Sequence, residues 1–211
     1  MKVDDALIYL LPDMPSCPAP LLTQNLLMAA REFCRETRCW KQELDPIPLV
    51  SGQRDYDLMP DNNQAQIFLL ERAELPGMQP LAVLDDTQRR PLDWMTATGM
   101  PRRARVSDDM QALQLYPLPS GQTLPALHVT VRLIPKLTAT MLPDSVLERH
   151  LEALTNGTKA RLMAMANRPW SDAAAAGYHR SLFAAAMNDA AATALTAGMT
   201  GSMFVTPPRF G

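Results

Sequence analysis

Histidine and cysteine are the side chains best able to bind a metal or attack a substrate, and the chain has three of each. The histidines lie on different predicted elements, without the paired spacing that zinc sites use: His128, His150 and His179. We expect His128 to face solvent on a strand and the other two to lie at helix–helix edges. Cys34 and Cys39 lie near the end of a predicted helix, and Cys17 precedes it. We expect all three cysteines to be reduced, and Cys34 and Cys39 to pack as small hydrophobic side chains, with no metal and no cofactor.

The sequence carries none of the short motifs that mark common enzyme sites. Its nine glycines are scattered and form neither G-x-x-x-x-G-K nor G-x-G-x-x-G, so no phosphate-binding loop is predicted. No G-x-S-x-G segment marks a hydrolase nucleophile. Adjacent carboxylates suit turns and helix caps better than a catalytic cleft: Asp4-Asp5, Asp85-Asp86 and Asp108-Asp109. We therefore expect that the chain is not an enzyme.

A cluster of arginines is the charged feature that could contact a partner. Strand alternation places Arg103 and Arg105 on one face, opposite Ala104. Arg132, on a later strand, joins that face if the two strands pair. Such a face can bind DNA phosphate or an acidic protein, and of these we favour the protein. The alternative, which we favour over both, is a solvated strand face balanced by nearby aspartates.

The composition is that of an ordinary globular chain. Of its 211 residues, 47% are hydrophobic and 20% charged, which argues against wholesale disorder. No uncharged apolar run reaches about 18 residues, so no membrane span is expected, and the acidic start does not resemble a secretory signal. The net charge of −2 gives no overall attraction to nucleic acid. Arg provides 16 of the 20 basic residues, and this skew favours contacts between proteins.

The elements that position these residues follow a helix–strand–helix order. A helix is predicted from Pro20 to Thr37, because apolar residues recur there with the helical period. Pro20 suits the first turn of such a helix, where its missing N–H costs nothing. The solvent-facing side of this helix is charged.

After Trp40 the apolar period changes to two, with prolines and glycines as turns. Residues 48–51 and 54–58 flank Gly52-Gln53 and predict a hairpin. Residues 65–74 predict a strand buried on both sides, because neither face is polar. Further strands are predicted at residues 102–107, 111–116 and 127–134. The middle of the chain therefore predicts a β-sandwich or a small β-barrel of about six strands.

Helical periodicity returns at Pro143 and breaks near Pro169. Small residues form a stripe on this helix, which indicates close approach of another backbone: Ala153, Gly157, Ala160 and Ala164. A second helix, from Asp172 to Ala197 with Ser171 as its expected cap, is mostly Ala. We interpret it as pressed between neighbours, within the chain or between copies, and the alternative is a stable, partly exposed helix. Residues 199–211 predict an extended tail.

Together these segments predict an α+β fold. A helical bundle would combine the N-terminal helix with two long C-terminal helices, and a β-sandwich or small β-barrel would be inserted between them. The expected boundaries are 1–44 and 138–198 for the bundle, 45–137 for the inserted β-domain and 199–211 for an extended C-terminal arm.

Several short stretches resemble one known family in their order and spacing, over residues 10–192. The first are Leu11-Pro12, Cys17-Pro18-Ala19-Pro20-Leu21, Glu32-Phe33-Cys34-Arg35-Glu36-Thr37, Trp40 and Leu44-Asp45-Pro46-Ile47. The later ones are Gly52-Gln53, Tyr56-Asp57-Leu58, Asp93-Trp94, Ala97-Thr98-Gly99, Pro101-Arg102, Leu142-Pro143-Asp144, Arg168-Pro169-Trp170-Ser171 and Tyr178. On these residues the sequence resembles the head-to-tail adaptor (connector) proteins of tailed bacteriophages, the group similar to the tail tubular protein A of short-tailed phages.

This resemblance implies a non-enzymatic virion protein, made in the bacterial host cytoplasm and located at the head–tail junction. It implies a homo-oligomeric ring of about twelve copies below the portal protein, which extends the DNA channel and carries the tail or nozzle protein. DNA would pass through the lumen without sequence-specific binding, and no membrane would be involved. The alternatives are a phage neck or tail-terminator protein of different stoichiometry, and a small nucleic-acid-binding module.

The resemblance also implies contacts for the helices and the tail. In a ring each subunit meets two neighbours through different surfaces, and the expected packing residues are Ala153, Gly157, Ala160, Ala164, Tyr178, Leu182 and Ala186. The helical end would face the portal and the β-domain the tail. The C-terminal arm would reach into the portal and order on binding, through Phe204, Val205, Pro207, Pro208, Arg209 and Phe210.

Overall fold

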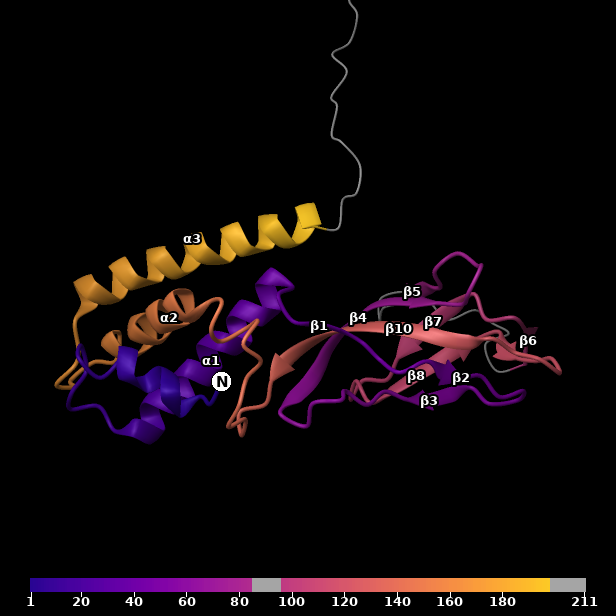
Figure 1. Ribbon diagram of the computed structural model, residues 1–211, viewed down its shortest axis with the longest axis horizontal. Coiled ribbons are helices and arrows are strands. Elements are labelled where there is room, and N and C mark those ends of the chain that lie inside the picture. Colours follow the sequence, from indigo (N-terminus) through magenta and orange to yellow (C-terminus); the bar gives the residue numbers. More distant parts are fainter. Residues whose placement is uncertain (85–95, 198–211) are drawn as a thin grey trace, which may run out of the picture.

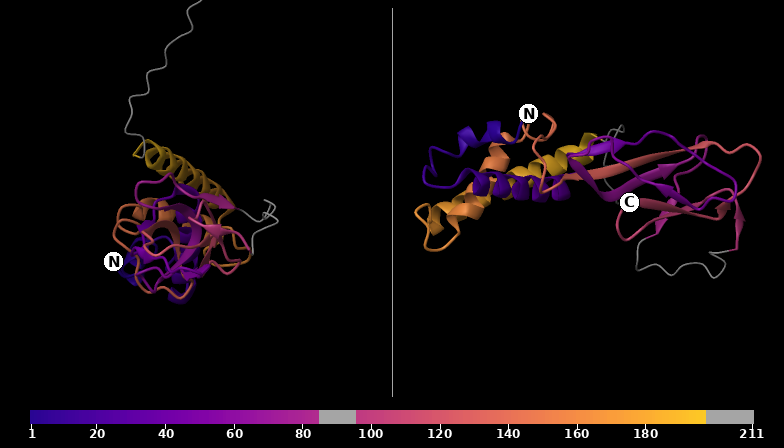
Figure 2. Two further views of the ribbon diagram at one scale, coloured as in Figure 1. Left: turned by 90° about the vertical axis from the view of Figure 1, so that its right-hand side faces the viewer. Right: turned by 90° about the horizontal axis from the view of Figure 1, so that it is seen from below.

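The computed structural model describes residues 1–84 and 96–197. The molecule is elongated, with the helices gathered at one end and the sheets extending to the other (Figure 1). The view from below in Figure 2 shows the same separation. The expected portal-binding arm, including Phe204 and Phe210, lies outside the described residues, as does the aspartate pair at 85–86.

The first long helix, α1 (Ala19–Thr37), confirms the prediction for this segment. Pro20 lies in the first turn, as expected. The helix ends where Arg38 adopts a left-handed conformation with φ 58°, which cannot continue it. A short 3-10 helix, η1 (Asp4–Tyr9), precedes α1 and packs against it. The apolar residues that defined the helical period are fully buried: Leu22, Leu26 and Phe33.

Two helices follow the strands, α2 (Leu151–Met163) and α3 (Ala173–Ala197). The predicted range of α3 is confirmed. The start predicted for α2, at Pro143, is too early, because residues 144–150 form turns, with the N–H groups of Val146 and Leu147 both bonded to the oxygen of Pro143.

The prediction that Ser171 caps α3 is wrong. The Ser171 hydroxyl accepts a hydrogen bond from the N–H of Arg168 and so closes the turn between the two helices. Asp172 is the cap instead: its Oδ1 accepts the N–H of Ala175 at 2.9 Å. This satisfies one of the backbone donors that the first turn of a helix leaves unpaired.

The first sheet is built around the long strand β10 (Ala126–Pro135). It pairs antiparallel with β1 (Lys41–Glu43), β2 (Ile47–Pro48) and β4 (Ala65–Glu74). The alternation predicted for β10 is confirmed by its fully buried face: Leu127, Val129, Val131 and Leu133. In Figure 1, β10 and β4 run along the long axis of the molecule toward the helical end.

The other strands form two further sheets at the far end of the molecule. The larger one has the order β3 (Asp55–Asp57), β8 (Ala112–Tyr116), β7 (Arg103–Val106) and β5 (Ala82–Leu84). The smaller one pairs β6 (Thr98–Gly99) with β9 (Leu118–Pro119). The α+β class is therefore confirmed. The described sheets stay open, so they do not form the small closed barrel that was one of the two expected β architectures.

The hairpin predicted around Gly52-Gln53 is wrong. Gly52 does occupy a turn with φ 82°, but the strands on its two sides diverge: β2 pairs with β10, whereas β3 pairs with β8. The Tyr56 hydroxyl holds the loop, donating to the oxygen of Val50 at 3.2 Å and accepting its N–H at 3.1 Å. The turn chemistry was correct, and the pairing partners lie far away in the sequence.

The prediction that β4 is buried on both sides is only partly correct. Ile67 and Leu70 are buried, but Leu69 on the other face is exposed. Its neighbour Phe68 is half-buried, because the guanidinium of Arg35 on α1 lies over the ring at 5.2 Å from the centroid. One apolar face of β4 therefore packs in the core, and a cation covers part of the other.

Candidate assembly surfaces

Helix α3 lies along the outside of the helical end, with α2 and α1 packed beneath one side of it (Figures 1 and 2). On that side Phe183 is fully buried and Ala176 is buried. On the outer side Tyr178 is 63% exposed, and Leu195 is exposed as well. Contacts within the described chain therefore cover one side of this Ala-rich helix and leave the other side to solvent.

Gly157 allows α2 and α3 to approach closely within the chain. A Cβ atom placed on Gly157 would lie only 2.9 Å from Cε2 of Phe183. Ala153 and Ala160 are buried as well, whereas Ala164 is exposed just after the end of α2. The close neighbour expected at Gly157 is thus a helix of the same chain. A role for this stripe between subunits stays a prediction.

A groove of about 280 Å³ lies between one flank of α2 and one flank of α3. Ala153 and Asn156 line it from α2, and Leu182 and Ala186 line it from α3. Tyr178 is one helical turn before Leu182 and therefore on the same flank of α3. The structure thus brings together several residues that the sequence suggested for subunit packing, and it places an exposed aromatic ring beside them.

A single carboxylate joins the three long helices. Glu32 on α1 accepts a hydrogen bond from Arg161 on α2, and its Oε1 lies 3.1 Å from a guanidinium nitrogen of Arg180 on α3. The Glu32 and Arg161 side chains are both largely buried, which reduces the screening of their attraction by water. This contact links α1, α2 and α3. It therefore helps to hold α3 in the orientation that exposes its outer side.

The three arginines proposed as a basic face do not form one strand face. Arg103 and Arg105 lie on β7, with Ala104 buried between them, as alternation predicted. Arg132 lies on β10 in a different sheet, and its Nε donates to Glu71 at 2.8 Å. The pairing that would have joined the arginines is absent between these described strands. Arg105 contacts Asp108 at 3.2 Å, which is the expected charge balance, but its side chain is only 15% exposed and so is not part of a fully solvated face.

The histidines stand apart from one another, as the sequence predicted. His128 is partly exposed and lies 3.4 Å from Glu43. The ring of His150 packs on Phe33 with centroids 4.6 Å apart, and His179 is 2.8 Å from the side-chain oxygen of Asn156 on the neighbouring helix. Burial is the main reason that the pKa values of His150 and His179 lie below their usual range. In the described ranges, no three His, Cys, Asp or Glu side chains could hold a metal ion together.

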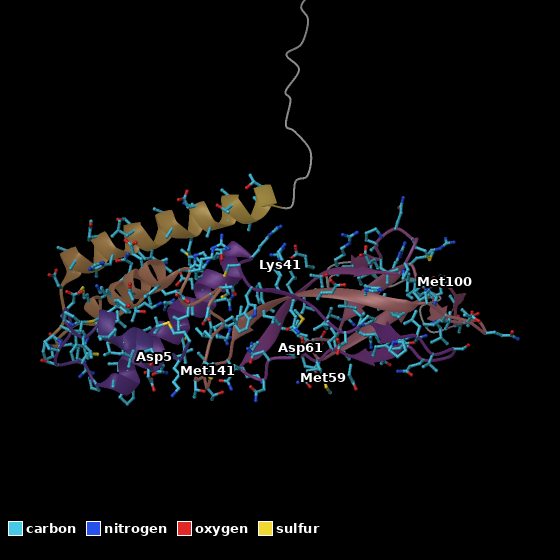
Figure 3. All side chains as sticks on the ribbon, viewed as in Figure 1. Asp5, Lys41, Met59, Asp61, Met100 and Met141 are labelled. Atoms are coloured by element: carbon cyan, nitrogen blue, oxygen red, sulfur yellow. The ribbon has the colours of Figure 1, made fainter. Side chains whose placement is uncertain are left out.

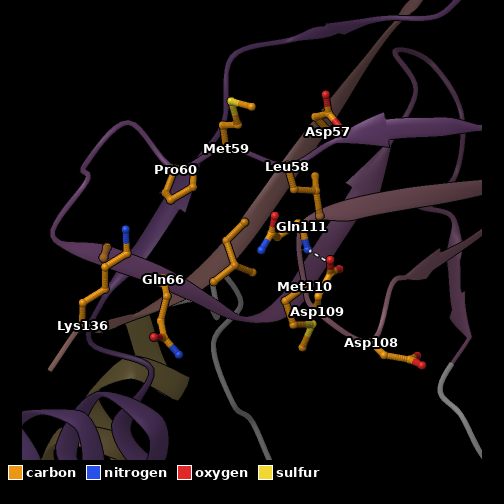
Figure 4. A pocket seen from close by; sticks show the side chains of 12 residues that line it. Asp57, Leu58, Met59, Pro60, Gln66, Asp108, Asp109, Met110, Gln111 and Lys136 are labelled. Carbon is orange, nitrogen blue, oxygen red and sulfur yellow. Dashed lines mark hydrogen bonds between the residues drawn. The ribbon is translucent and has the colours of Figure 1, made fainter.

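A pocket of about 730 Å³ opens between β3, β4 and the turn before β8 (Figure 4). Its carboxylates are Asp57, Asp108 and Asp109, and they face Lys136 across the opening. The Asp109 carboxylate bonds within the turn itself, because it accepts hydrogen bonds from the Ser107 hydroxyl and from the N–H of Gln111. The Ser107 hydrogen bond is the main reason that the pKa of Asp109 lies below its usual range. The described lining pairs no nucleophile with a base.

A second pocket, of about 440 Å³, was not foreseen from the sequence. It lies between the end of α1, the turn before α2 and the last turns of α3. Arg38, Cys39, Lys41, Arg149 and His150 line it, together with small residues of α3. Cys34 is buried, as predicted, whereas Cys39, for which burial was also predicted, is only half-buried because it borders this opening. These cationic residues come from separate segments, so neither spacing nor charge runs could have indicated the pocket.

In the described residues, no helix combines the length and the apolarity that crossing a membrane would need. The fold and these surfaces define an elongated α+β protein with a helical end, a sheet-rich end and an exposed Ala-rich helix, a shape suited to assembly with other proteins. The family described as SU10 adaptor protein matches residues 3–204, nearly the whole chain. The chain therefore belongs to this family of phage adaptors, which confirms the resemblance to head-to-tail adaptor proteins. A comparison with curated proteins finds no match.

Proposed function

We propose that the chain forms a homo-oligomeric ring of about twelve copies between the portal protein and the tail of a phage particle. The ring would extend the DNA channel and provide the platform for the tail or nozzle protein. The observation that carries this proposal is the family match over residues 3–204. The elongated shape, with different architectures at its two ends, supports it because an adaptor needs two different partners.

In this ring the outer flank of α3 contacts the next subunit. Each subunit of a closed ring uses two different surfaces, one toward each neighbour. The groove between α2 and α3, with the exposed Tyr178 beside it, is one such surface. The contact set is the one expected from the sequence: Ala153, Gly157, Ala160, Ala164, Tyr178, Leu182 and Ala186. Gly157 acts indirectly, because it holds α3 in place through Phe183.

The helical end faces the portal and the sheet-rich end faces the tail. The portal contact includes the C-terminal arm, residues 199–211, with Phe204, Val205, Pro207, Pro208, Arg209 and Phe210. We expect that a chain truncated after Gly198 folds as the full chain does but no longer binds portal particles. Co-sedimentation with purified portal measures this, and full binding of a normally folded truncation would overturn the arm assignment.

Counting subunits in particles by electron microscopy tests the ring itself. About twelve copies in one layer directly below the portal would support the proposal. A different stoichiometry, or a position at the far end of the tail, would instead identify a neck or tail-terminator protein. DNA passes through the lumen without sequence-specific binding in this proposal, so affinity for duplex DNA in a gel-shift experiment is expected to be independent of sequence.

A further inference from the structure

Two cysteine sulfur atoms lie in contact at the point where α1 ends. Sγ of Cys39 is 3.6 Å from Sγ of Cys34, and the two are not joined by a disulfide. Cys34 is in the last turn of α1 and buried, whereas Cys39 follows the left-handed residue Arg38. The left-handed turn at Arg38 reverses the chain and returns Cys39 to the helix.

Cys39 is accessible from the cationic pocket between α1 and α3. The pocket has room for a small molecule, at about 440 Å³, and its described lining includes no carboxylate. Lys41 is paired with Glu71 at 2.7 Å. Arg38 and Arg149 form no ion pair with any residue in the ranges 1–84 and 96–197, so their charge is available to an anionic ligand.

The two thiols differ in acidity in the direction that an exchange reaction requires. The hydrogen bond with Cys34 lowers the pKa of the Cys39 thiol and outweighs the effect of burial, and Thr37 and Arg149 lower it further. The same hydrogen bond, together with burial, raises the pKa of Cys34 well above its usual value. The thiolate is the reactive form of cysteine, so Cys39 is the attacking group.

We propose that Cys39 is a site of thiol–disulfide exchange with small anionic disulfides, and that Cys34 resolves the product into a Cys34–Cys39 disulfide. In the first step the Cys39 thiolate attacks one sulfur of the small disulfide and expels its other half as a thiolate. In the second step Cys34 loses its proton, attacks Sγ of Cys39 and expels the second half. The small disulfide is the oxidant: it is reduced to two thiols while the two cysteines are oxidised.

This site is independent of the adaptor role. The disulfide would close a short loop between the last turn of α1 and the segment that enters β1, and so would constrain the connection from the helical end to the first sheet. Cys17 offers an internal control, because it is buried elsewhere and burial raises its pKa.

The test treats the full, reduced chain with oxidised glutathione, blocks the remaining thiols and maps each cysteine by peptide mass spectrometry. We expect a Cys34–Cys39 disulfide while Cys17 stays reduced. In Cys34→Ser the reaction should stop at a mixed disulfide between Cys39 and glutathione. In Cys39→Ser, modification of Cys34 should be at least about tenfold slower than formation of the disulfide in the unaltered chain.

A second measurement tests the pocket and depends on no cysteine substitution. Oxidised glutathione is anionic and cystamine is a cationic disulfide, so Cys39 should prefer glutathione when both rates are divided by those of a small free thiol. Arg149→Ala should reduce that preference. Equal normalised rates, equal modification of Cys17, or a wild-type product that remains a mixed disulfide would each overturn the proposal.

Discussion

The Cβ position of Gly157 on α2 lies within 3.0 Å of three atoms of the Phe183 ring on α3. Phe183 is fully buried and its centroid lies 6.1 Å from that of Phe33 on α1. The ring therefore has other helices around it and little room to move. The absence of a side chain at Gly157 sets the distance between α2 and α3.

Gly157→Ala is expected to destabilise the protein by about 1–3 kcal/mol, because the added methyl group overpacks a closed contact. This is the net loss, after the gain of about 1 kcal/mol that Ala normally brings to a helix interior has offset part of the overpacking cost. Urea denaturation of the full chain measures the difference. The loss should be smaller in a Phe183→Leu background, where the obstructing ring is gone, and equal losses in both backgrounds would contradict the contact.

Gly177→Ala is the matched control on α3. A Cβ atom at Gly177 meets nothing within 4 Å, and the residue is exposed. The substitution should therefore stabilise the chain by about 0.5–1 kcal/mol through helix propensity alone. A gain at Gly177 together with a loss at Gly157 separates packing from propensity.

Glu32→Gln is expected to destabilise the helical end by about 1–2 kcal/mol, since it weakens charged hydrogen bonds to two helices at once. Arg161 and Arg180 would both lose their anionic partner. Glu36→Gln, on the exposed side of the same helix, should change the free energy of unfolding by less than about 0.5 kcal/mol. Similar effects at the two positions, measured by urea denaturation, would show that the three-helix contact contributes little.

The Glu71 carboxylate should make stability depend on pH. It lies between Lys41 and Arg132, and the Glu71 and Arg132 side chains are only 21% and 12% exposed. Burial alone would raise its pKa, but the hydrogen bonds from Lys41 and Arg132 outweigh burial and hold it below the usual value of 4.5. A lowered folded-state pKa stabilises the protein above pH 4.5, and this contribution is lost as pH falls through the folded-state pKa.

Glu71→Gln should therefore lower the free energy of unfolding by about 1–2 kcal/mol at pH 7, and the difference from the unaltered chain should shrink below pH 4.5. Urea denaturation at several pH values measures this. Glu43→Gln, at an exposed carboxylate on strand β1 of the same sheet, is the control with little expected effect. A difference for Glu71→Gln that stays constant with pH would contradict the assigned ionisation.

Tyr178→Arg is expected to weaken ring assembly about tenfold without changing the stability of the single chain. The exposed ring adds apolar contact area beside the groove, and a charge there would have to be desolvated in an interface. Sedimentation, alone or with purified portal, measures the number of copies assembled. Asn188→Arg, exposed elsewhere on α3, is the control, and equal effects of the two substitutions would place the interface away from Tyr178.

The parts of the fold that the sequence predicted correctly are those with a sustained period. α1 and β10 repeat apolar residues over many positions, and local geometry alone then determines the buried face, whereas the Ala-rich run predicted the extent of α3 but not which side is buried. The hairpin at Gly52 failed because a turn signal does not say which strands pair. β2 pairs with β10 and β3 pairs with β8, and both partners are distant in the sequence.

The candidate surfaces were likewise predicted only in part from the sequence. The small residue at Gly157 signalled a close contact, but the sequence could not show that its neighbour is Phe183 of the same chain. The pairing of Arg132 with Glu71 crosses 61 positions, and no local pattern distinguishes such an arginine from an exposed one. The Cys34–Cys39 contact depends on the left-handed conformation of Arg38. The residue types between the two cysteines do not indicate that conformation.

The direction of β10 has a mechanical consequence. β10 and β4 run lengthwise between the sheet-rich end and the helices (Figure 3). They pair antiparallel, so the hydrogen bonds between them are perpendicular to that direction. A pull between the two ends of the molecule would load these bonds together, in shear, rather than open them one after another. Tension transmitted through a single subunit would then be shared along the whole β10–β4 ladder, from residue 128 to residue 135 of β10.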